Sequence, residues 1–186
     1  MPRTADHESR RQQVAEALLR VIVRGGLAEA SLATVAKEAG VSVGLIQRYF
    51  TTKAELLDFA FTHLYDRTIE RIAAVPRTGS IPEIAYLMLE SMLPLDDERF
   101  AEASVWVAFL AGTMPNPEAI APHVAGMRRM HGELMGNGLP RAEAVLLTSV
   151  VDGLSLDLVT GQGEVTAEDA RACLRLAVDR AFGGET

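Results

Sequence analysis

Apolar residues recur at the three- and four-residue spacing of amphipathic helices along most of the chain, and no stretch of useful length alternates as a half-buried strand does. Glycine and proline residues interrupt the apolar runs and mark where helices end. The pattern therefore predicts an all-α protein of about nine helices. They are expected over residues 9–24, 32–39, 43–49, 52–74, 82–93, 98–112, 117–135, 140–160 and 167–182.

The second and third of these helices are short and closely joined. Ser31 is a suitable N-cap for the first of the pair, because its hydroxyl can accept a backbone N–H of the first turn. Gly40 follows the last apolar residue of that helix, where a left-handed residue often ends a helix. Ser42 can cap the second helix two residues later. Two helices joined by such a turn are typical of proteins that place a helix in the DNA major groove.

The next helix also carries a start signal. Thr52 can act as its N-cap and Glu55 stands at the capping-box position. Lys53 lies beside the positive end of this helix, where a phosphate would be favoured. The segment 31–57 thus predicts two capped helices followed by the start of a third.

Polar residues on the outer side of the second short helix suit DNA. Gln47 can pair with adenine, Arg48 can pair with guanine, and Gly44 has no side chain to keep DNA at a distance. An ordinary helical corner in an all-α core is the alternative interpretation of the same spacing. The predicted DNA contacts are Ser31, Thr34, Ser42, Val43, Gly44, Gln47, Arg48, Tyr49, Thr52 and Lys53.

This segment resembles the DNA-binding domain of the TetR family of transcriptional regulators. The resemblance rests on Ala39-Gly40-Val41-Ser42, Gly44, Tyr49-Phe50, Lys53 and Glu55-Leu56-Leu57, and it extends upstream to about Arg10. Val43 and Gln47 depart from the residues common in the family at those positions. The resemblance therefore implies DNA binding without implying a particular operator sequence.

The overall charge of −7 is unusual for a DNA-binding protein, but it is unevenly distributed. Residues 1–60 carry a net charge of +1 and residues 61–186 carry −8. DNA affinity would therefore depend on a few placed phosphate contacts, for which Arg10, Arg11, Arg48 and Lys53 are candidates.

The last two helices are apolar over more than one stripe, which exceeds what a surface helix needs. They are either central core helices or faces buried against a partner. The resemblance implies the second interpretation, because TetR-like proteins pair through their last two helices as a four-helix bundle. The expected homodimer contacts are Val150, Gly153, Leu154, Leu158, Leu174 and Val178.

Aromatic and methionine residues are frequent in the middle helices, where they could line an apolar pocket or simply fill the core. The pocket interpretation follows from the resemblance, since family members bind small-molecule effectors in this part of the chain. Candidate lining residues are Tyr65, Tyr86, Trp106, Phe109, Met127 and Met130. This part of the chain also resembles the regulatory domain of the betaine-synthesis regulator subgroup. The resemblance rests on Trp106–Phe109, Asn116-Pro117 and Asp152-Gly153-Leu154. Regulators of unrelated pathways share that domain, so no effector is implied.

Other chemistry is poorly supported. Cys173 is the only cysteine, so no internal disulfide can form, and His123 and His131 lack a third ligand at metal spacing. Neither a signal peptide nor a spanning segment is apparent, so we expect a cytoplasmic protein without membrane contact. We expect no cofactor, no metal and no catalytic residues. An enzyme and a helical protein-interaction module that does not bind DNA are the alternative classes.

The sequence thus predicts a helix-turn-helix domain over residues 1–55 and a helical effector-binding and dimerisation domain over residues 56–186. The expected function is ligand-responsive transcriptional regulation, with repression the favoured mode. A homodimer would bind a palindromic double-stranded DNA operator, and a small-molecule effector would release it.

Overall fold

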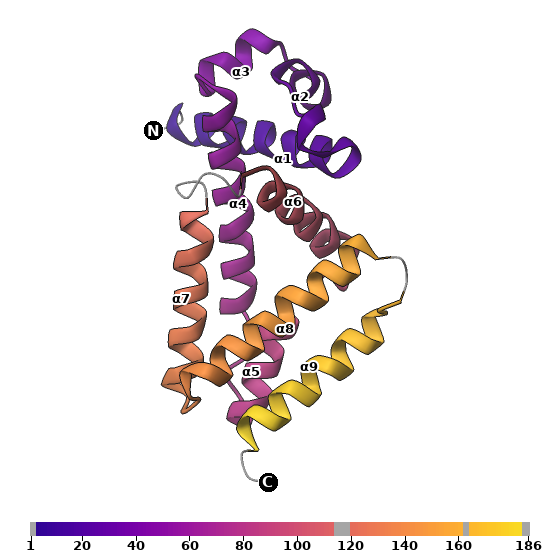
Figure 1. The fold of residues 1–186 in the computed structure, drawn as a ribbon. Coiled ribbons are helices and arrows are strands. Elements are labelled where there is room, and N and C mark those ends of the chain that lie inside the picture. Colours follow the sequence, from indigo (N-terminus) through magenta and orange to yellow (C-terminus); the bar gives the residue numbers. More distant parts are fainter. Residues whose placement is uncertain (1–2, 114–119, 162–163, 184–186) are drawn as a thin grey trace. The chain divides into compact units, whose positions relative to one another are not determined.

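The computed structural model describes residues 3–113, 120–161 and 164–183, and within these ranges the chain forms nine helices and no strand (Figure 1). The all-α prediction is confirmed. The chain packs as two compact units, one formed by the described residues of Met1–Asp66 and Ser104–Ile120, the other by those of Arg67–Ala103 and Ala121–Thr186. Each unit has its own apolar core.

The first unit contains α1 (Arg3–Glu29), α2 (Leu32–Ala39), α3 (Val43–Tyr49), the first part of α4 (Lys53–Ala73) and the last part of α6 (Asp97–Thr113). Helix α1 packs along α2, and α2 packs against α3. The core of this unit includes almost completely buried side chains at Leu18, Val35, Ile46, Phe50 and Leu56. Because these residues come from α1, α2, α3, the turn after α3 and α4, their burial fixes the short helices against the longer ones.

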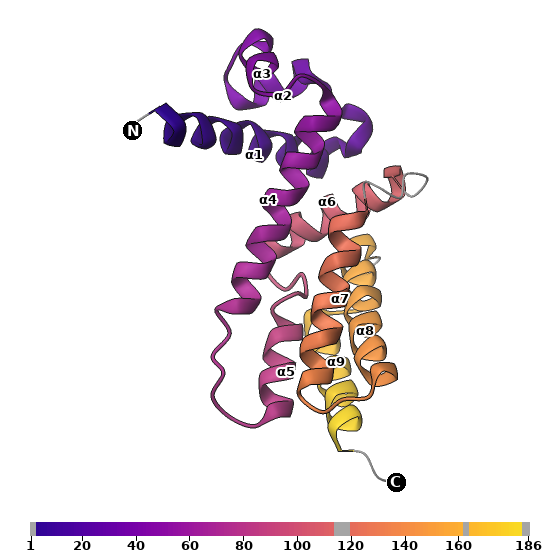
Figure 2. The same cartoon turned by 90° about the vertical axis from the view of Figure 1, so that its left-hand side faces the viewer.

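The second unit contains the remainder of α4 and α6, together with α5 (Ile81–Glu90), α7 (Ala121–Gly136), α8 (Arg141–Thr160) and α9 (Ala167–Phe182). Helix α8 packs against α7 and α9, and α5 packs against α9 (Figure 2). The core of this unit includes Leu89, Leu134, Leu147 and Leu174, which are at most 2% exposed. Buried leucines at helical spacing explain why these elements associate.

Most helix ends follow the sequence signals. Helix α1 begins at Arg3 instead of Ser9. Gly26, with φ 73° and ψ 177°, interrupts the helical backbone two residues after the predicted helix end at residue 24, and the helix resumes beyond this kink up to Glu29. Helix α5 ends at Glu90, three residues before the predicted end. The predicted helix start at Pro117, like the Asn116-Pro117 pair, lies outside the described residues.

Candidate DNA-binding site

Helices α2 and α3 are held in place by the predicted caps. The Ser31 hydroxyl accepts the Thr34 N–H at 3.1 Å, and the Ser42 hydroxyl accepts the Leu45 N–H at 3.2 Å. Gly40 ends α2 with φ 69°, and the following Val41 N–H donates to the Ala36 carbonyl at 3.0 Å. A left-handed residue at this position strongly favours glycine, so Gly40 shapes the turn that sets α3 against α2.

Helix α3 separates packing residues from exposed residues. Ile46 is fully buried, Tyr49 is half-buried and packs against the core, and Leu45 is half-buried. The opposite side carries Val43, Gly44, Gln47 and Arg48, all exposed. Fixing one side of a short helix in a rigid core presents the other side in a defined orientation, as base reading requires.

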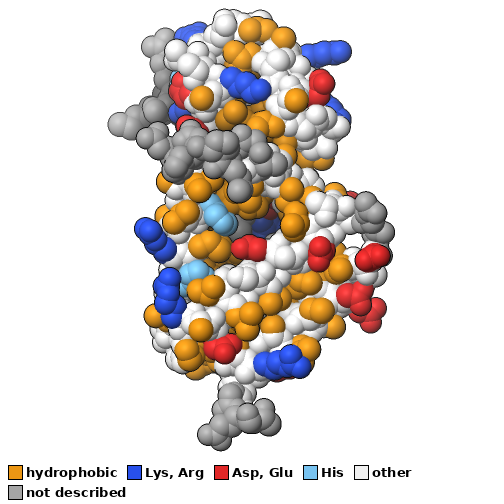
Figure 3. Space-filling view, viewed as in Figure 1, with side chains coloured by type: hydrophobic (Ala, Val, Ile, Leu, Met, Phe, Trp, Pro, Cys, Tyr) orange, Lys and Arg blue, Asp and Glu red, His pale blue; other side chains and the backbone are white. Residues whose placement is uncertain are grey.

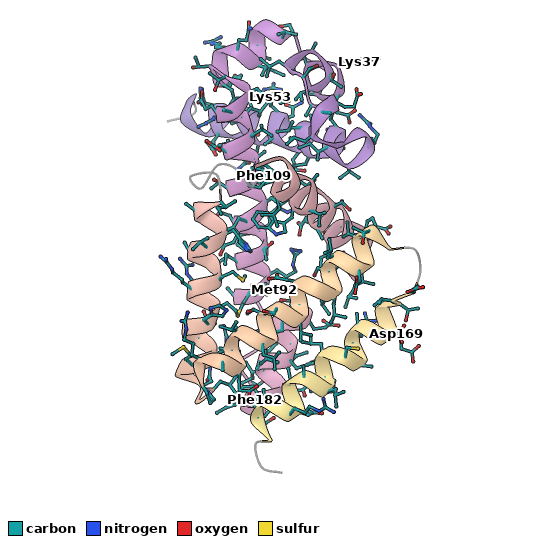
Figure 4. All side chains as sticks on the ribbon, in the orientation of Figure 1. Lys37, Lys53, Met92, Phe109, Asp169 and Phe182 are labelled. Atoms are coloured by element: carbon teal, nitrogen blue, oxygen red, sulfur yellow. The ribbon has the colours of Figure 1, made fainter. Side chains whose placement is uncertain are left out.

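The start of α4 adds hydroxyl and ammonium groups to this unit. The Thr52 hydroxyl accepts the Glu55 N–H at 3.1 Å, and the Glu55 carboxylate accepts the Thr51 N–H at 2.7 Å. Lys53 lies where α4 begins (Figure 4), is exposed, and donates weakly to the Leu27 carbonyl at 3.4 Å. Its ammonium can leave this long hydrogen bond for a phosphate at little cost.

The remaining predicted DNA contacts have both structural and surface roles. Ser31 is exposed and shares a hydrogen bond of 2.7 Å with the half-buried Thr34 hydroxyl. The half-buried Tyr49 ring meets the His7 ring edge-on, with centroids 4.7 Å apart. This contact adds His7, on α1, to the surroundings of α3. No sequence motif signalled it, because the two residues are 42 positions apart.

Arg11, a candidate phosphate contact in the sequence, makes contacts within the first unit. Its guanidinium lies 4.9 Å from the ring centroid of Phe50 and 4.3 Å from that of Phe59, and it is 3.8 Å from the Glu55 carboxylate. Arg11 therefore joins α1 to the start of α4 as an internal contact. Arg10, by contrast, is exposed and donates to the Gln13 side chain at 2.9 Å.

Glu38 links α2 to α1. Its carboxylate accepts from Arg20 at 2.8 Å and also pairs with Arg24. The hydrogen bonds from Arg20 and Arg24 hold the pKa of Glu38 below its ordinary value of 4.5. These two arginines are therefore engaged within the unit, which leaves Arg48 and Lys53 as the more available cations near α3.

The residues predicted to line an effector pocket fall into both units. In the first unit, Trp106 and Phe109 form an aromatic cluster with Phe61, whose ring centroid lies 3.5 Å from that of Phe109, and Tyr65 lies on α4. In the second unit, the Tyr86 ring lies 3.5 Å below the Arg175 guanidinium, Met130 is buried and Met127 is half-buried.

The residues predicted to form the dimer interface differ in exposure. Leu174 and Val178 are fully buried within the unit, Val150, Leu154 and Leu158 are half-buried, and Gly153 is exposed. Side chains over α8 and α9 include many apolar groups on the face shown in Figure 3. The large exposed apolar residues of these two helices are Val145, Leu146, Leu156 and Leu176.

Two polar clusters of the second unit were missed by sequence reasoning. On α7 and α8, His131 hydrogen-bonds to Thr148 at 2.9 Å. Although Asp152 retains solvent exposure, the protein packed around its carboxyl raises the pKa of that group, while His123 and His131 oppose the shift. Burial lowers the pKa of His123.

The other cluster joins α4 to α6. Glu102 is buried, pairs with Arg71, and lies 3.1 Å from Arg67. Burial raises the pKa of Glu102 against the opposing effect of the two arginines. Spacing along the sequence could not reveal either cluster, because its members come from separate helices.

Comparison with known proteins agrees with this geometry. A family model described as bacterial regulatory proteins of the tetR family matches residues 15–59, and a model described as the C-terminal part of BetI-type transcriptional repressors matches residues 83–183. The first match contains α2, α3 and the start of α4. The second contains α7, α8 and α9.

Curated relatives are similar over most of their length. The HTH-type transcriptional regulator PksA of Bacillus subtilis is 36% identical over 168 residues, covering 84% of this chain and 82% of PksA. The HTH-type transcriptional regulator BetI of Burkholderia cenocepacia is 31% identical over 195 residues, covering 96% of this chain and 95% of BetI.

Solved structures share the fold. A transcriptional regulator from Rhodococcus sp. Rha1 has a TM-score of 0.84 at 31% identity, covering 94% of this chain and 96% of that one. A regulator from Saccharomonospora viridis, solved in complex with choline, has a TM-score of 0.83 at 20% identity, covering 93% and 97%, a likeness that concerns the fold alone. These matches and the capped helix pair lead to one conclusion: the chain belongs to the TetR family of transcriptional regulators, with a C-terminal part of the BetI type, and is not an enzyme.

Proposed function

We propose that this regulator is a repressor that binds a palindromic operator as a homodimer and leaves it when a small-molecule effector binds. The observation that carries the DNA-binding part is α3 itself. Ser42 caps the helix, Ile46 anchors it in the core, and Gln47 and Arg48 remain exposed. In a major groove, the Gln47 amide suits adenine and the Arg48 guanidinium suits guanine.

Hydroxyls and an ammonium surround this helix and suit the DNA backbone. Lys53 supplies a positive charge. The hydroxyls belong to Ser31, Thr34, Ser42, Tyr49 and Thr52. The capping hydroxyls of Ser42 and Thr52 accept backbone N–H groups, which leaves their own hydrogens available to donate to phosphate oxygens. These contacts would orient α3 on the duplex without reading its sequence.

Residues 1–55 would then act as the DNA-binding domain and residues 56–186 as the domain for effector and partner. Helix α4 runs without interruption from Lys53 to Ala73 and so belongs to both. A dimer on a palindrome must hold its two α3 helices about 34–36 Å apart, which is one turn of DNA. An effector that shifts α4 would change this spacing and weaken DNA binding, and DNA would weaken effector binding by the same factor.

The dimer would form through α8 and α9. Leu146, Leu156 and Leu176 are 48–53% exposed, and a partner subunit that covered them would remove apolar surface from water. Val150, Gly153, Leu154 and Leu158 on α8 would lie in or beside this interface. Leu174 and Val178 would support it from within the core.

An effector of small size is supported by the BetI-type match and by the choline bound to the regulator from Saccharomonospora viridis. Each unit keeps its own candidates for effector contact. They are Tyr65, Trp106 and Phe109 in the first unit, and Tyr86, Met127 and Met130 in the second. A regulator that acts on chromosomal DNA would work in the cytoplasm, and no helix in the described part of the chain has the length and apolarity needed to cross a membrane.

The DNA-binding proposal is tested by selecting sites from random double-stranded DNA with the full chain. We expect a palindrome to be enriched. Gln47→Ala and Arg48→Ala should each weaken binding to it by about 1–3 kcal/mol and relax selection at one base pair per half-site. Arg129→Ala, which removes an exposed arginine of α7, serves as the matched control.

Two results would contradict the proposal. If no sequence is enriched, the chain is a helical interaction module that does not bind DNA. If Gln47→Ala and Arg48→Ala bind every half-site variant as the unmodified chain does, α3 does not read bases. Effector release is tested by titrating the selected operator with candidate small molecules, and an unchanged affinity rejects the compound in question.

A further inference from the structure

Gly44 is a helix residue that no contact among the described residues requires to be glycine. Its φ is not positive, in contrast to Gly26 and Gly40, so its backbone conformation is open to other residues. In the part of the chain that the structure describes, a Cβ placed at this position meets no atom outside its own helical turn within 4 Å. Gly44 is the second residue of α3, and glycine is less favourable there than alanine because it loses more backbone entropy on folding.

Val43, the neighbouring residue, is also poorly explained by the fold. It is 37% exposed, and it stands beside Gln47 and Arg48 on the polar side of α3. A β-branched residue is not favoured in a helix, and exposing it to water adds nothing to the core. An apolar side chain next to a position without a side chain would suit a partner surface that approaches closely and has an apolar group of its own.

We infer that Val43 and Gly44 together read the 5-methyl group of a thymine in each operator half-site. This inference rests on the proposed DNA binding of α3. Among the base edges in the major groove, only that of thymine presents a methyl group. Gly44 lets α3 approach the base edges, and the Val43 methyl groups then cover the thymine methyl group and remove it from water.

The position of Gln47 extends the inference to the neighbouring base pair. Gln47 follows Val43 by four residues and therefore lies on the same row of the helix surface, one turn further along. Its amide suits the N6 and N7 atoms of adenine. The half-site should therefore contain a thymine that contacts Val43, close to an adenine that contacts Gln47.

The thymine contact is tested by removing only the methyl group. Each thymine of the selected operator is replaced in turn by uracil, and the dissociation constant is measured by fluorescence anisotropy with the full chain. We expect one thymine per half-site at which uracil weakens binding by about fourfold, the value for burying one methyl-sized group. Val43→Ala should bind the thymine operator more weakly and lose most of its discrimination between thymine and uracil at that position.

Gly44→Ala tests the close approach. The added methyl group has free space among the described residues, and alanine loses less backbone entropy than glycine on folding, so the variant should be at least as stable as the unmodified chain. It should nevertheless bind the operator about tenfold or more weakly, because the Cβ would hold α3 away from the bases. Gly132→Ala is the matched control, since Gly132 is an exposed glycine of α7 that also has open space around it. It should gain stability without any change in DNA affinity.

The outcomes separate this inference from the proposed function. If no DNA sequence is selected, the proposed DNA binding itself fails. If a palindrome is selected but every uracil substitution is neutral, or Val43→Ala discriminates uracil as the unmodified chain does, the thymine contact is wrong. Unchanged operator affinity in Gly44→Ala also overturns the inference while leaving the proposed function intact.

Discussion

Arg11 and Lys53 show that similar charges near one surface can have different roles. Arg11 lies over the rings of Phe50 and Phe59, and its buried Nε has no hydrogen-bond partner among the described residues. Its long apolar stem and planar guanidinium fill space between helices. Lys53 is exposed and makes one long hydrogen bond. We therefore assign a structural role to Arg11 and a phosphate-binding role to Lys53.

Arg11→Ala should lower the stability of the folded chain by about 1–2 kcal/mol, because the guanidinium no longer packs over the two rings. The salt dependence of operator binding should stay the same. Chemical denaturation measures the stability, and binding at several salt concentrations gives the slope. A reduced slope with unchanged stability would show that Arg11 contacts phosphate instead.

Lys53→Ala should behave in the opposite way. The folding stability of this variant should change little. The slope of log affinity against log salt concentration should become less steep by about one for each phosphate that the lysine neutralises. All operator variants should be weakened alike. A weakening confined to particular bases would contradict the phosphate assignment and indicate base reading.

At the level of elements, ion pairs supplement the caps that the sequence predicts. Glu38 joins α2 to two arginines of α1. In the second unit, Arg175 of α9 donates to Glu83 of α5 at 2.7 Å. In both pairs the partners lie far apart in the sequence, so each interaction depends on the completed fold.

Glu38→Gln should make the first unit less sensitive to acid. Because the folded-state pKa of Glu38 is lowered, its contribution to stability is complete above the ordinary value of 4.5 and is lost as the pH falls through the folded-state value. The stability difference between the unmodified chain and Glu38→Gln should therefore shrink below pH 4.5. Urea unfolding at several pH values measures it, with Glu29→Gln as a surface control. A constant difference across this range would contradict the assignment.

The parts of the fold that the sequence predicted well are those with local causes. Ser31, Gly40 and Ser42 marked the boundaries of α2 and α3. Thr166 and Asp169 form a capping box at the start of α9, which lies at the predicted residue 167. In each case the group that caps the helix is within four residues of the group it satisfies. Local signals of this kind can be recognised in a single sequence.

The parts that could not be predicted depend on contacts between distant residues. The buried pairing of Glu102 with Arg71 joins residues 31 positions apart, and the His7–Tyr49 contact joins α1 to α3. Likewise, the apolar spacing of α9 could not show that Leu174, predicted as a dimer contact, is buried within its own unit while Leu176 is exposed. Which apolar stripe turns outward depends on where the neighbouring helices pack.

At the level of the whole molecule, oligomeric state should depend on the exposed apolar residues of α8 and α9. A symmetric pair of subunits would place each of these residues in the interface twice, once from each copy. Burying them would explain why α8 is apolar on more than one side. The acidic charge of the rest of the chain would limit contact with DNA to the helix-turn-helix region.

Leu156→Glu should convert the proposed dimer to monomer, raising the dissociation constant by about 100-fold or more, because two like charges would be brought together in an apolar contact. Sedimentation equilibrium measures this. Ile81→Glu is the control, since Ile81 is 47% exposed and lies on α5. The variant should keep its helical circular dichroism. A surviving dimer would place the interface elsewhere.

The two-sided construction of α3 also bears on how such regulators diversify. The residues that hold the helix, such as Ile46, and the residues that face outward, such as Gln47, occupy separate sides of the same seven-residue segment. Substitutions on the outward side leave the core intact, so they are not opposed by selection for folding. After a gene duplication, one copy can therefore acquire a new set of target genes through a few outward changes while its scaffold stays the same.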